Sequence, residues 1–325
     1  MIKVGIVGAS GYTAGELIRC LVHHPDVEID FLYSHSQSGK NVEEFHEDLF
    51  DYPELNLSQN INYDVDALFL CLGHGNSKQF LSKNKFSAST KIIDLSNDFR
   101  LKADAEFEGM PFTYGLVELN KTQIQKSQYI ANPGCFATAI QLALLPLAKA
   151  GLLKTDVHIN AITGSTGAGQ KPSETSHFSW RNNNVSIYKA FNHQHLGEIG
   201  ESIVQLQNGF SEELNFLPLR GNFTRGILAS VYLKSNKSEE ELKQLFSNFY
   251  EDSNFVKTTN KNINLKQVVN TNYALLQVQK IDGKVLITSA IDNLLKGAAG
   301  QAIENLNLMF GFAPKTGLQF KANFF

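Results

Sequence analysis

Cys135 stands where a cysteine could act as a nucleophile. It follows a turn at 132–134 (Asn-Pro-Gly), between a short apolar run at 129–131 and a long apolar segment at 136–147. A strand, a turn and a helix are the economical interpretation, which places Cys135 in the first turn of the helix. Helix starts favour negative charge and lower the pKa of a cysteine, so they favour the nucleophilic thiolate. The alternative is a small buried residue, the usual setting of a free cysteine.

His193, His195 and Glu198 form a second candidate group, within six residues of the chain. A cysteine nucleophile needs a partner for proton transfer, and histidine is the side chain poised near neutral pH. On an extended segment, the two histidines would point the same way. The alternatives are a polar loop or a metal site. A zinc site needs three or four ligands, and the other candidates are scattered singly, so we expect no metal.

A glycine-rich turn at 8–15 follows an apolar run at 2–7 and precedes an apolar helical face at 17–22. Strand, glycine turn and helix is the dinucleotide-binding arrangement, in which the helix start takes the pyrophosphate. The spacing is Gly-x-x-Gly-x-x-Gly. Glycines also serve ordinary tight turns, so the placement of the motif carries most of its weight.

The loop at 34–40 indicates which nicotinamide cofactor would bind. It follows an expected second strand at 27–33 and holds three serines, a histidine and a lysine, but no acid. NAD-binding units place an acid there to hold the ribose 2′-hydroxyl. The loop therefore favours the 2′-phosphate of NADP, unless it is only a polar surface loop.

Further strands are expected at 66–72 and 91–95, and they alternate with helices. This pattern predicts an open, mostly parallel sheet, which binds ligands outside the carboxyl ends of its strands. Gly73, Ser96 and Cys135 each follow such an end, so we expect all three to face one crevice.

Helix starts are marked at two further places. Asn76 or Ser77 could cap the helix after the strand at 66–72. Ser238 and Glu241 have the spacing of a capping box.

The pattern changes after a helix that ends near Ala150. Longer strands, with fewer helices between them, are expected at 156–163, 224–233, 273–279 and 285–291. The last two flank Asp282-Gly283, a strong hairpin signal. This half predicts a mixed, largely antiparallel sheet with helices, followed by a final helix over about 296–310.

The composition and charge of the chain exclude some classes of function. The chain has 325 residues, enough for two domains, with 42% hydrophobic and 19% charged residues and a net charge of −3. It shows no basic block and no apolar stretch of spanning length, so we expect neither nucleic-acid nor membrane partners. Three cysteines give no disulfide framework and favour a reducing compartment, which predicts a cytoplasmic protein.

Five motifs, in order along the chain, together resemble the N-acetyl-γ-glutamyl-phosphate reductase family, the arginine-pathway member of the semialdehyde dehydrogenase group. They lie at 8–13, 94–100, 132–135, 193–195 and 292–302. The resemblance implies an α/β fold: a Rossmann-type doubly wound parallel sheet with an inserted α+β catalytic domain of mixed, largely antiparallel sheet. The expected domains are 1–134 plus 294–325 for NADP and 135–293 for catalysis and oligomerisation, in a homodimer or homotetramer.

The resemblance also implies residue roles. Cys135 would be the nucleophile and His193 the acid/base, while His195, Glu198 and Arg225 would bind the substrate. The residues expected to bind the cofactor are Gly8, Ser10, Gly11, Tyr12, Thr13, Ala14, Ser34, Gly73, His74, Ser96, Pro133, Gly164, Ser165 and Asn293.

Two positions and one stretch depart from the family pattern. Ala14 replaces a further glycine, and His35 stands where the cofactor loop usually carries an arginine. The stretch at 171–188 is unlike the familiar pattern. Because this stretch precedes the histidines, we expect it to shape the pocket for the acyl group of the substrate. The sequence does not decide between an acetyl and a succinyl group.

The implied reaction is NADPH-dependent reduction of a small-molecule acyl phosphate through a Cys135 thioester, which gives N-acyl-glutamate 5-semialdehyde and phosphate. Related reductases of aspartyl phosphate or of a carrier-bound aminoadipyl phosphate would share the fold and the nucleophile. A non-catalytic NADP-sensing module is the alternative from another class. Such a module has no use for a helix-start cysteine together with His193.

Overall fold

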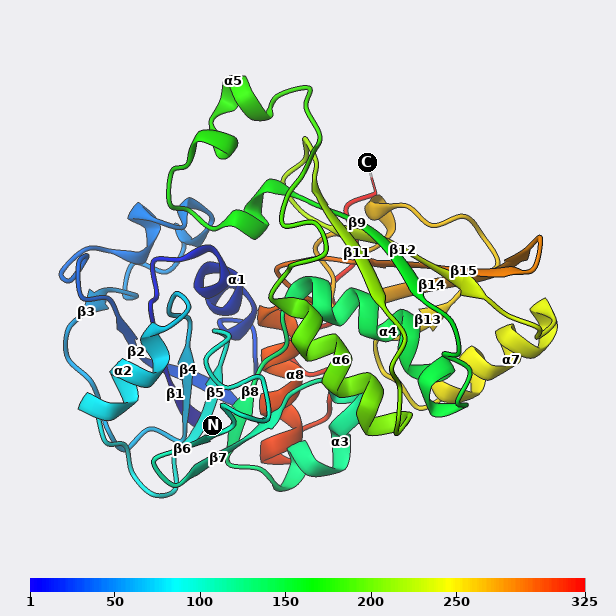
Figure 1. Ribbon diagram of the computed structural model, residues 1–325. Helices are drawn as coiled ribbons and strands as arrows, with labels where there is room; N and C mark the ends of the chain where they lie inside the picture. The colour runs from blue at the N-terminus through cyan, green and yellow to red at the C-terminus, as the bar shows by residue number, and fades with distance from the viewer. Residues whose placement is uncertain (325) are drawn as a thin grey trace. The chain divides into compact units, whose positions relative to one another are not determined.

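A computed structural model describes residues 1–324; residue 325, the end of the expected NADP-binding domain, lies outside them. The chain forms two compact units (Figure 1). The first comprises Met1–Pro133 and Ala298–Gln319, and the second comprises Gly134–Gly297 with 320–324.

The first unit is built on an eight-stranded sheet, parallel throughout except for one edge pair. The strand order is β3-β2-β1-β4-β5-β8-β7-β6, and only β6 and β7 pair antiparallel. Helix α8 packs against α1 and α3. The strands are β1 (Ile2–Val7), β2 (Val27–Tyr33), β3 (Leu57–Ser58), β4 (Ala67–Leu70), β5 (Lys91–Asp94), β6 (Glu106–Phe107), β7 (Met110–Tyr114) and β8 (Tyr129–Ala131). The helices are α1 (Tyr12–Leu21), α2 (Asn76–Lys83), α3 (Val117–Lys126) and α8 (Ala299–Phe310), with 3-10 turns η1 (Val42–Glu44) and η2 (Glu47–Leu49).

The second unit is built on a seven-stranded mixed sheet, in the order β10-β11-β9-β12-β15-β14-β13. Four of the six neighbouring pairs are antiparallel, and β11–β9 and β13–β14 are parallel. The strands are β9 (Val157–Thr163), β10 (Ser186–Ile187), β11 (Leu214–Arg220), β12 (Ile227–Lys234), β13 (Val256–Thr258), β14 (Ala274–Ile281) and β15 (Lys284–Ile291). The helices are α4 (Cys135–Lys149), α5 (Phe178–Arg181), α6 (His195–Leu206) and α7 (Glu239–Phe249), with 3-10 turns η3 (Ser165–Ala168), η4 (Glu174–Ser176) and η5 (Leu265–Gln267).

The expected fold class is confirmed: one sheet is mostly parallel and the other is mixed and largely antiparallel. The expected hairpin joins β14 to β15, and Asp282 and Gly283 both have positive φ, as a tight hairpin turn requires. The capping box of Ser238 and Glu241 is also present.

The expected cap of α2 is wrong. Gly75, in the left-handed conformation, is the N-cap, and neither Asn76 nor Ser77 caps the helix. The carboxylate of Asp98 instead accepts hydrogen bonds from the backbone N–H groups of Gly75, Ser77 and Lys78. A cap 20 residues or more away in sequence leaves no local pattern.

Helix α8 begins at Ala299, three residues later than expected. The delay has a local cause in the turn before it. The carboxylate of Asp292 accepts from the backbone N–H groups of Leu294 and Leu295, which holds this segment in a turn.

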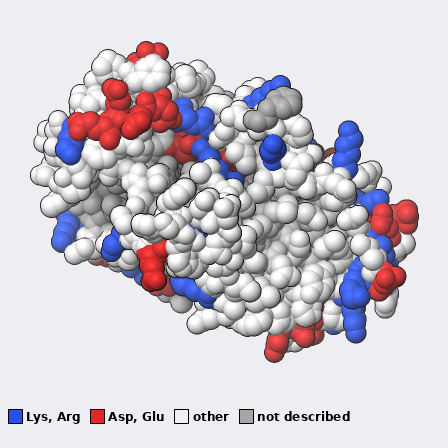
Figure 2. Space-filling view, turned by 90° about the horizontal axis from the view of Figure 1, so that it is seen from above, with Lys and Arg blue, Asp and Glu red and all other residues white. Residues whose placement is uncertain are grey.

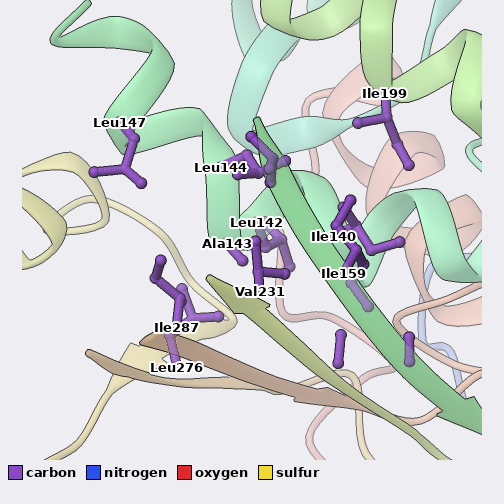
Figure 3. Close-up of a cluster of buried hydrophobic side chains, with 14 of the residues drawn as sticks. Ile140, Leu142, Ala143, Leu144, Leu147, Ile159, Ile199, Val231, Leu276 and Ile287 are labelled. Atoms are coloured by element: carbon purple, nitrogen blue, oxygen red, sulfur yellow. The ribbon is translucent and has the colours of Figure 1, made fainter. Parts of the chain in front are cut away.

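Helix α4 is buried along almost its whole length, and it packs against α6 and against strands β12, β14 and β15. Figure 3 shows Ile140, Leu142, Ala143, Leu144 and Leu147 of this helix with side chains from the sheet and from α6. A helix that is apolar on all sides is a core helix. The position of its first residue, Cys135, is therefore fixed by the packing of the core.

Charged side chains lie in small groups of mixed sign on the face displayed in Figure 2. Among residues 1–324, no helix combines the length and the apolar character needed to cross a membrane.

Candidate functional site

Cys135 is the first residue of α4, as expected, and it is partly exposed. Its N-cap, Gly134, has extended backbone and no acid stands in the first turn of the helix. A Cβ atom added to Gly297 would lie 2.8 Å from the Cβ of Cys135. The turn before α8 can therefore approach the thiol only because residue 297 is glycine.

The other two cysteines are poorly suited to chemistry. Cys20 is fully buried in α1. Burial raises the pKa of Cys71 well above its ordinary value, and the charge of Asp94 adds to the shift. A protonated thiol is a weak nucleophile, so these environments leave Cys135 as the candidate.

Glu198 connects α6 to the start of the cysteine helix. Its Oε2 accepts a hydrogen bond of 2.9 Å from the backbone N–H of Gly134, and its Oε1 lies 3.8 Å from Nε2 of His195. The carboxylate is buried. Glu198 therefore fixes the residue that precedes Cys135, a contact that sequence spacing does not reveal.

His193 and His195 lie in contact, with ring centroids 4.6 Å apart at 68°. The expectation of an extended segment is wrong, because Gln194 is helical and His195 begins α6. The backbone N–H of His195 donates to Nδ1 of His193 over 3.3 Å. With Nδ1 accepting, the ring proton of neutral His193 is on Nε2.

Apolar and aromatic groups enclose His193. The rings of Phe136, Tyr188 and Phe216 lie 5.5–5.8 Å from the His193 ring. Phe136 directly follows Cys135 in the chain. The residue that packs against the imidazole is therefore the sequence neighbour of the thiol. Burial lowers the pKa of His193 to about 4, the positive charges of Lys189 and Arg220 act in the same direction, and Glu198 opposes them.

We expect His193 to remain neutral across the physiological range. A pKa lowered to about 4 means that the ring takes up its second proton only as the pH falls toward 4. In a nuclear magnetic resonance titration, the His193 signal, identified by its loss in His193→Asn, should stay constant from pH 8 to about 5. A midpoint near 6.5 would show that burial does not control this ring.

Tyr188 and Arg220 belong to the same surroundings, and sequence reasoning missed both. The guanidinium carbon of Arg220 lies 4.6 Å from the centre of the Tyr188 ring. Burial raises the pKa of Tyr188 to about 12, and Cys135 adds to the shift while Arg220 opposes it. The phenol therefore remains a hydrogen-bond donor beside the thiol at neutral pH.

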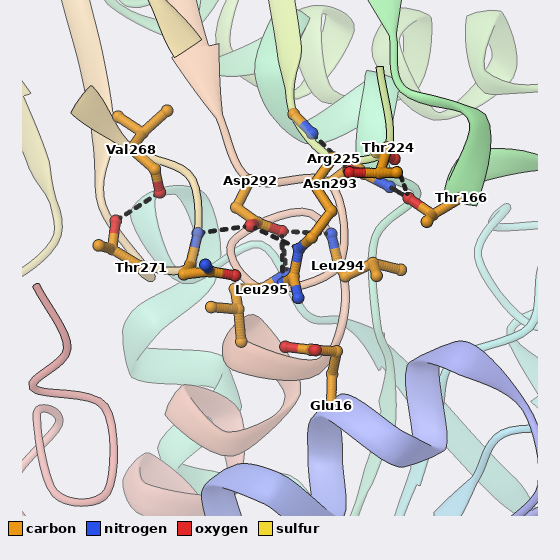
Figure 4. Close-up of polar contacts among 12 residues, drawn as sticks. Glu16, Thr166, Thr224, Arg225, Val268, Thr271, Asp292, Asn293, Leu294 and Leu295 are labelled. Atoms are coloured by element: carbon orange, nitrogen blue, oxygen red, sulfur yellow. Dashed lines mark hydrogen bonds and ion pairs between the residues drawn. The ribbon is translucent and has the colours of Figure 1, made fainter. Parts of the chain in front are cut away.

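Arg225 is held in a partly buried ion pair. Its Nε and Nη2 donate to the carboxylate of Asp292 over 3.0 and 3.1 Å (Figure 4). Asp292 is fully buried and also accepts from the backbone N–H of Asn270. The bidentate geometry fixes the orientation of the guanidinium.

Asn293, Gly164 and Ser165 lie in the same unit as Cys135. The amide of Asn293 is engaged at both ends: its oxygen accepts from the backbone N–H of Gly226, and its nitrogen donates to Thr166 (Figure 4). Gly164 is the N-cap of turn η3, and a Cβ there would lie 2.3 Å from the carbonyl oxygen of Thr224. Their cofactor role stays a prediction.

The glycine turn after β1 leads directly into helix α1. Gly8 has φ +82°, and a Cβ there would lie 2.6 Å from the carbonyl oxygen of Cys71. Gly11 is the N-cap of α1, without a side-chain cap or an acid in the first turn. Ser10 directly precedes this N-cap. Tyr12, Thr13 and Ala14 are the first three residues of the helix.

His46, which sequence reasoning missed, supports this turn. A Cβ on Gly15 would lie 2.4 Å from Nδ1 of His46, and Nε2 of His46 lies 2.9 Å from the carbonyl oxygen of Ala9. The ring occupies the space that the missing side chain leaves.

The remaining expected cofactor residues follow strand ends of the first unit. Ser34 follows β2 and is buried, and its N–H donates to the carbonyl of Ser58. Gly73 and His74 follow β4, and Nδ1 of His74 accepts from the backbone N–H of Asn97. Ser96 follows β5, and Pro133 follows β8.

Asp94, beneath this edge, is fully buried. Ser77 and Ser96 donate hydrogen bonds to its carboxylate over 2.5 and 2.7 Å. Burial raises the pKa of Asp94 to about 6 against the opposing effect of these bonds. Ser96 is thus tied to the strand that precedes it.

Comparisons with known proteins follow the same division. Residues 3–127 match the family model of the semialdehyde dehydrogenase NAD-binding domain, and residues 135–293 match that of the semialdehyde dehydrogenase dimerisation domain. Proteins named N-acetyl-gamma-glutamyl-phosphate reductase from Flavobacterium johnsoniae and Christiangramia forsetii are 61% and 57% identical, each over 100% of both chains.

Solved structures show a likeness of fold. Aspartate semialdehyde dehydrogenase II of Vibrio cholerae, complexed with ASA, aligns with a TM-score of 0.72 at 16% identity, over 96% of this chain and 98% of that chain. The Candida albicans aspartate semialdehyde dehydrogenase with NADP aligns with a TM-score of 0.70 at 14% identity, over 95% and 98%.

Proposed function

The chain belongs to the N-acetyl-γ-glutamyl-phosphate reductase family of semialdehyde dehydrogenases, and we propose that it reduces an N-acyl-γ-glutamyl phosphate to the 5-semialdehyde, with NADPH as reductant. The observation that carries the proposal is Cys135 at the start of the buried helix α4, where the next residue, Phe136, packs against the enclosed imidazole of His193. The reaction belongs to arginine biosynthesis.

The first unit suits a dinucleotide. The missing Cβ of Gly8 lets the turn pack closely against the backbone of Cys71, and no side chain caps the start of α1, which leaves its N–H groups for the pyrophosphate. Ser34 and the acid-free loop after it suit the 2′-phosphate. We assign residues 1–134 with 294–325 to NADP and 135–293 to catalysis and subunit contact. When bound, the cofactor supplies hydride to the substrate carbonyl.

The first chemical step is acyl transfer to Cys135. The thiolate attacks the γ-carbonyl carbon, a C–S bond forms, the C–O bond to phosphate breaks, and the departing phosphate takes up a proton from water. The start of α4 favours the thiolate and can stabilise the oxyanion of the tetrahedral species. Neutral His193 presents Nε2–H as a hydrogen-bond donor to the developing oxyanion.

The second step releases the product. Once the thioester carbonyl is reduced, the C–S bond of the tetrahedral alkoxide breaks, the aldehyde forms, and Cys135 leaves as thiolate. His193 stabilises the alkoxide through Nε2–H and yields no net proton in this step.

We assign substrate binding to His195, Glu198 and Arg225. Glu198 also holds Gly134, and Arg225 is oriented by Asp292, so each of these charged side chains is preorganised by the protein before substrate binds.

The subunits are expected to assemble as homodimers or homotetramers in the cytoplasm. The match of residues 135–293 to a dimerisation domain supports self-association. Three free cysteines are compatible with a reducing compartment.

An NADPH-oxidation assay tests the proposed function. We expect turnover with N-acetyl- or N-succinyl-γ-glutamyl phosphate generated in situ, and not with aspartyl phosphate. NADPH should bind more tightly than NADH by about 1–3 kcal/mol, since the 2′-phosphate gains charge-assisted hydrogen bonds. Ser34→Asp should abolish this preference by repulsion. Turnover of aspartyl phosphate alone would reject the substrate, and equal dissociation constants would reject the cofactor.

A further inference from the structure

Arg220 lies near the candidate catalytic group and has no acidic partner among residues 1–324. It is the last residue of β11 and is half-buried, and no ion pair joins it to a carboxylate within residues 1–324. Its Nε is buried and has no hydrogen-bond partner there. A buried charged donor left unsatisfied is costly, so proteins retain one where a ligand completes it.

Thr163 lies directly opposite Arg220. The two residues are in register in the parallel pair β9–β11, so their side chains lie on one face of the sheet. Thr163 is 1% exposed, and its hydroxyl oxygen also has no hydrogen-bond partner among the described residues. Two unsatisfied polar groups, a guanidinium N–H and a hydroxyl, therefore stand side by side.

This face of β11 leads to the catalytic residues. Phe216, four residues before Arg220 on the same strand face, packs against His193. Arg220 stacks on Tyr188, whose ring lies 5.8 Å from that of His193. A ligand held by Arg220 would lie beside the reacting groups.

Neighbouring residues hold the pair in place. Nη1 of Arg181 donates to the carbonyl oxygen of Arg220 over 2.7 Å, which ties the unusual stretch at 171–188 to the end of β11. Gly167 stands over Thr163, and a Cβ there would lie 3.2 Å from the hydroxyl oxygen. A glycine at this position avoids a tight contact with the buried hydroxyl.

We propose that Arg220 and Thr163 together bind a carboxylate of the substrate, and that they are specificity-determining residues. The planar guanidinium stacked on Tyr188 presents its N–H groups in one plane, which matches a carboxylate. Thr163 adds a neutral donor to the same anion. Arg225 already pairs with Asp292, so Arg220 is the arginine whose charge a substrate would neutralise.

This inference rests on the proposed function. The recognised carboxylate can be either of two groups of the substrate. Every N-acylglutamyl phosphate carries an α-carboxylate, whereas a succinyl group adds a second one. Three substrates separate them: N-acetylglutamyl phosphate, N-succinylglutamyl phosphate, and 4-acetamidobutyryl phosphate, which lacks only the α-carboxylate.

The test compares kcat/KM of wild type and Arg220→Gln on all three substrates. We expect a loss of about 10- to 150-fold, the worth of a charge-assisted hydrogen bond, on each substrate that carries the recognised carboxylate. Loss on both glutamyl phosphates, with 4-acetamidobutyryl phosphate spared, identifies the α-carboxylate. Loss on the succinyl substrate alone identifies the acyl carboxylate.

Further variants separate binding from folding. Arg220→Lys should recover part of the loss, Thr163→Val should cost about 2- to 10-fold on the same substrates, and Lys171→Gln, an exposed cation of the same unusual stretch, should change none of them. An equal loss by Arg220→Gln on all three substrates would overturn the inference, because it would indicate a role in the fold or toward the phosphate. Failure of the wild type to use any glutamyl phosphate would instead remove the proposed function, and this inference with it.

Discussion

Replacing Cys135 with alanine should lower turnover by at least about 10⁴-fold while leaving the fold intact. Loss of a nucleophile that acts together with its proton donor typically costs this much or more. The side chain is partly exposed at the start of α4, and the helix is held by the core from Phe136 to Ala148. Alanine keeps the helix start, so Tm and NADPH binding should stay close to those of the wild type.

Alkylation gives an independent check of the same thiol. Iodoacetamide should label Cys135 before Cys20, which is fully buried, and before Cys71, whose pKa burial raises. Preloading with acyl phosphate should protect Cys135. Cys71→Ala is the matched control and should retain full activity. Faster labelling of Cys71, or residual turnover in Cys135→Ala, would assign the nucleophile elsewhere.

His193→Asn should lower kcat by about 10²- to 10⁴-fold, the range typical for loss of a group that acts as acid/base or as hydrogen-bond donor to an oxyanion. The asparagine oxygen can still accept from the backbone N–H of His195, so the start of α6 should be preserved. What the substitution removes is the donor at Nε2. Substrate binding should change little.

His195→Asn is the matched comparison, since the two rings are 4.6 Å apart and equally buried. We expect it to raise KM more than it lowers kcat, because its neighbour is the carboxylate of Glu198. A collapse of kcat in the His195 variant alone would exchange the two roles. An equal collapse in both would mean that the pair works as one unit.

Local signals predicted the elements that carry the candidate chemistry. The strands Ile2–Val7, Val27–Tyr33 and Tyr129–Ala131 have the bounds expected from their apolar runs, and Cys135 begins its helix. These features depend on neighbours in sequence: a Pro-Gly turn, a glycine turn and helical periodicity. They are also where the family motifs lie.

The features that escaped prediction depend on distant residues. Strand β11 contains Pro218, which lowers the strand signal, and its partner β9 lies more than 50 residues earlier, so the position of Arg220 was hidden. The contact of Glu198 with Gly134 and the ion pair of Arg225 with Asp292 each span more than 60 residues. Their geometry follows from tertiary packing, which one sequence does not display.

The most direct test of the covalent mechanism is the mass of the acylated enzyme. Wild-type protein should be mixed with N-acyl-γ-glutamyl phosphate in the absence of NADPH, quenched in acid and digested. We expect the peptide that holds Cys135 to gain the mass of one N-acylglutamyl group, with one phosphate released per adduct, and NADPH added before the quench should remove the adduct as semialdehyde. Reduction of the substrate at the full rate with no adduct on Cys135 at any time would contradict a thioester intermediate.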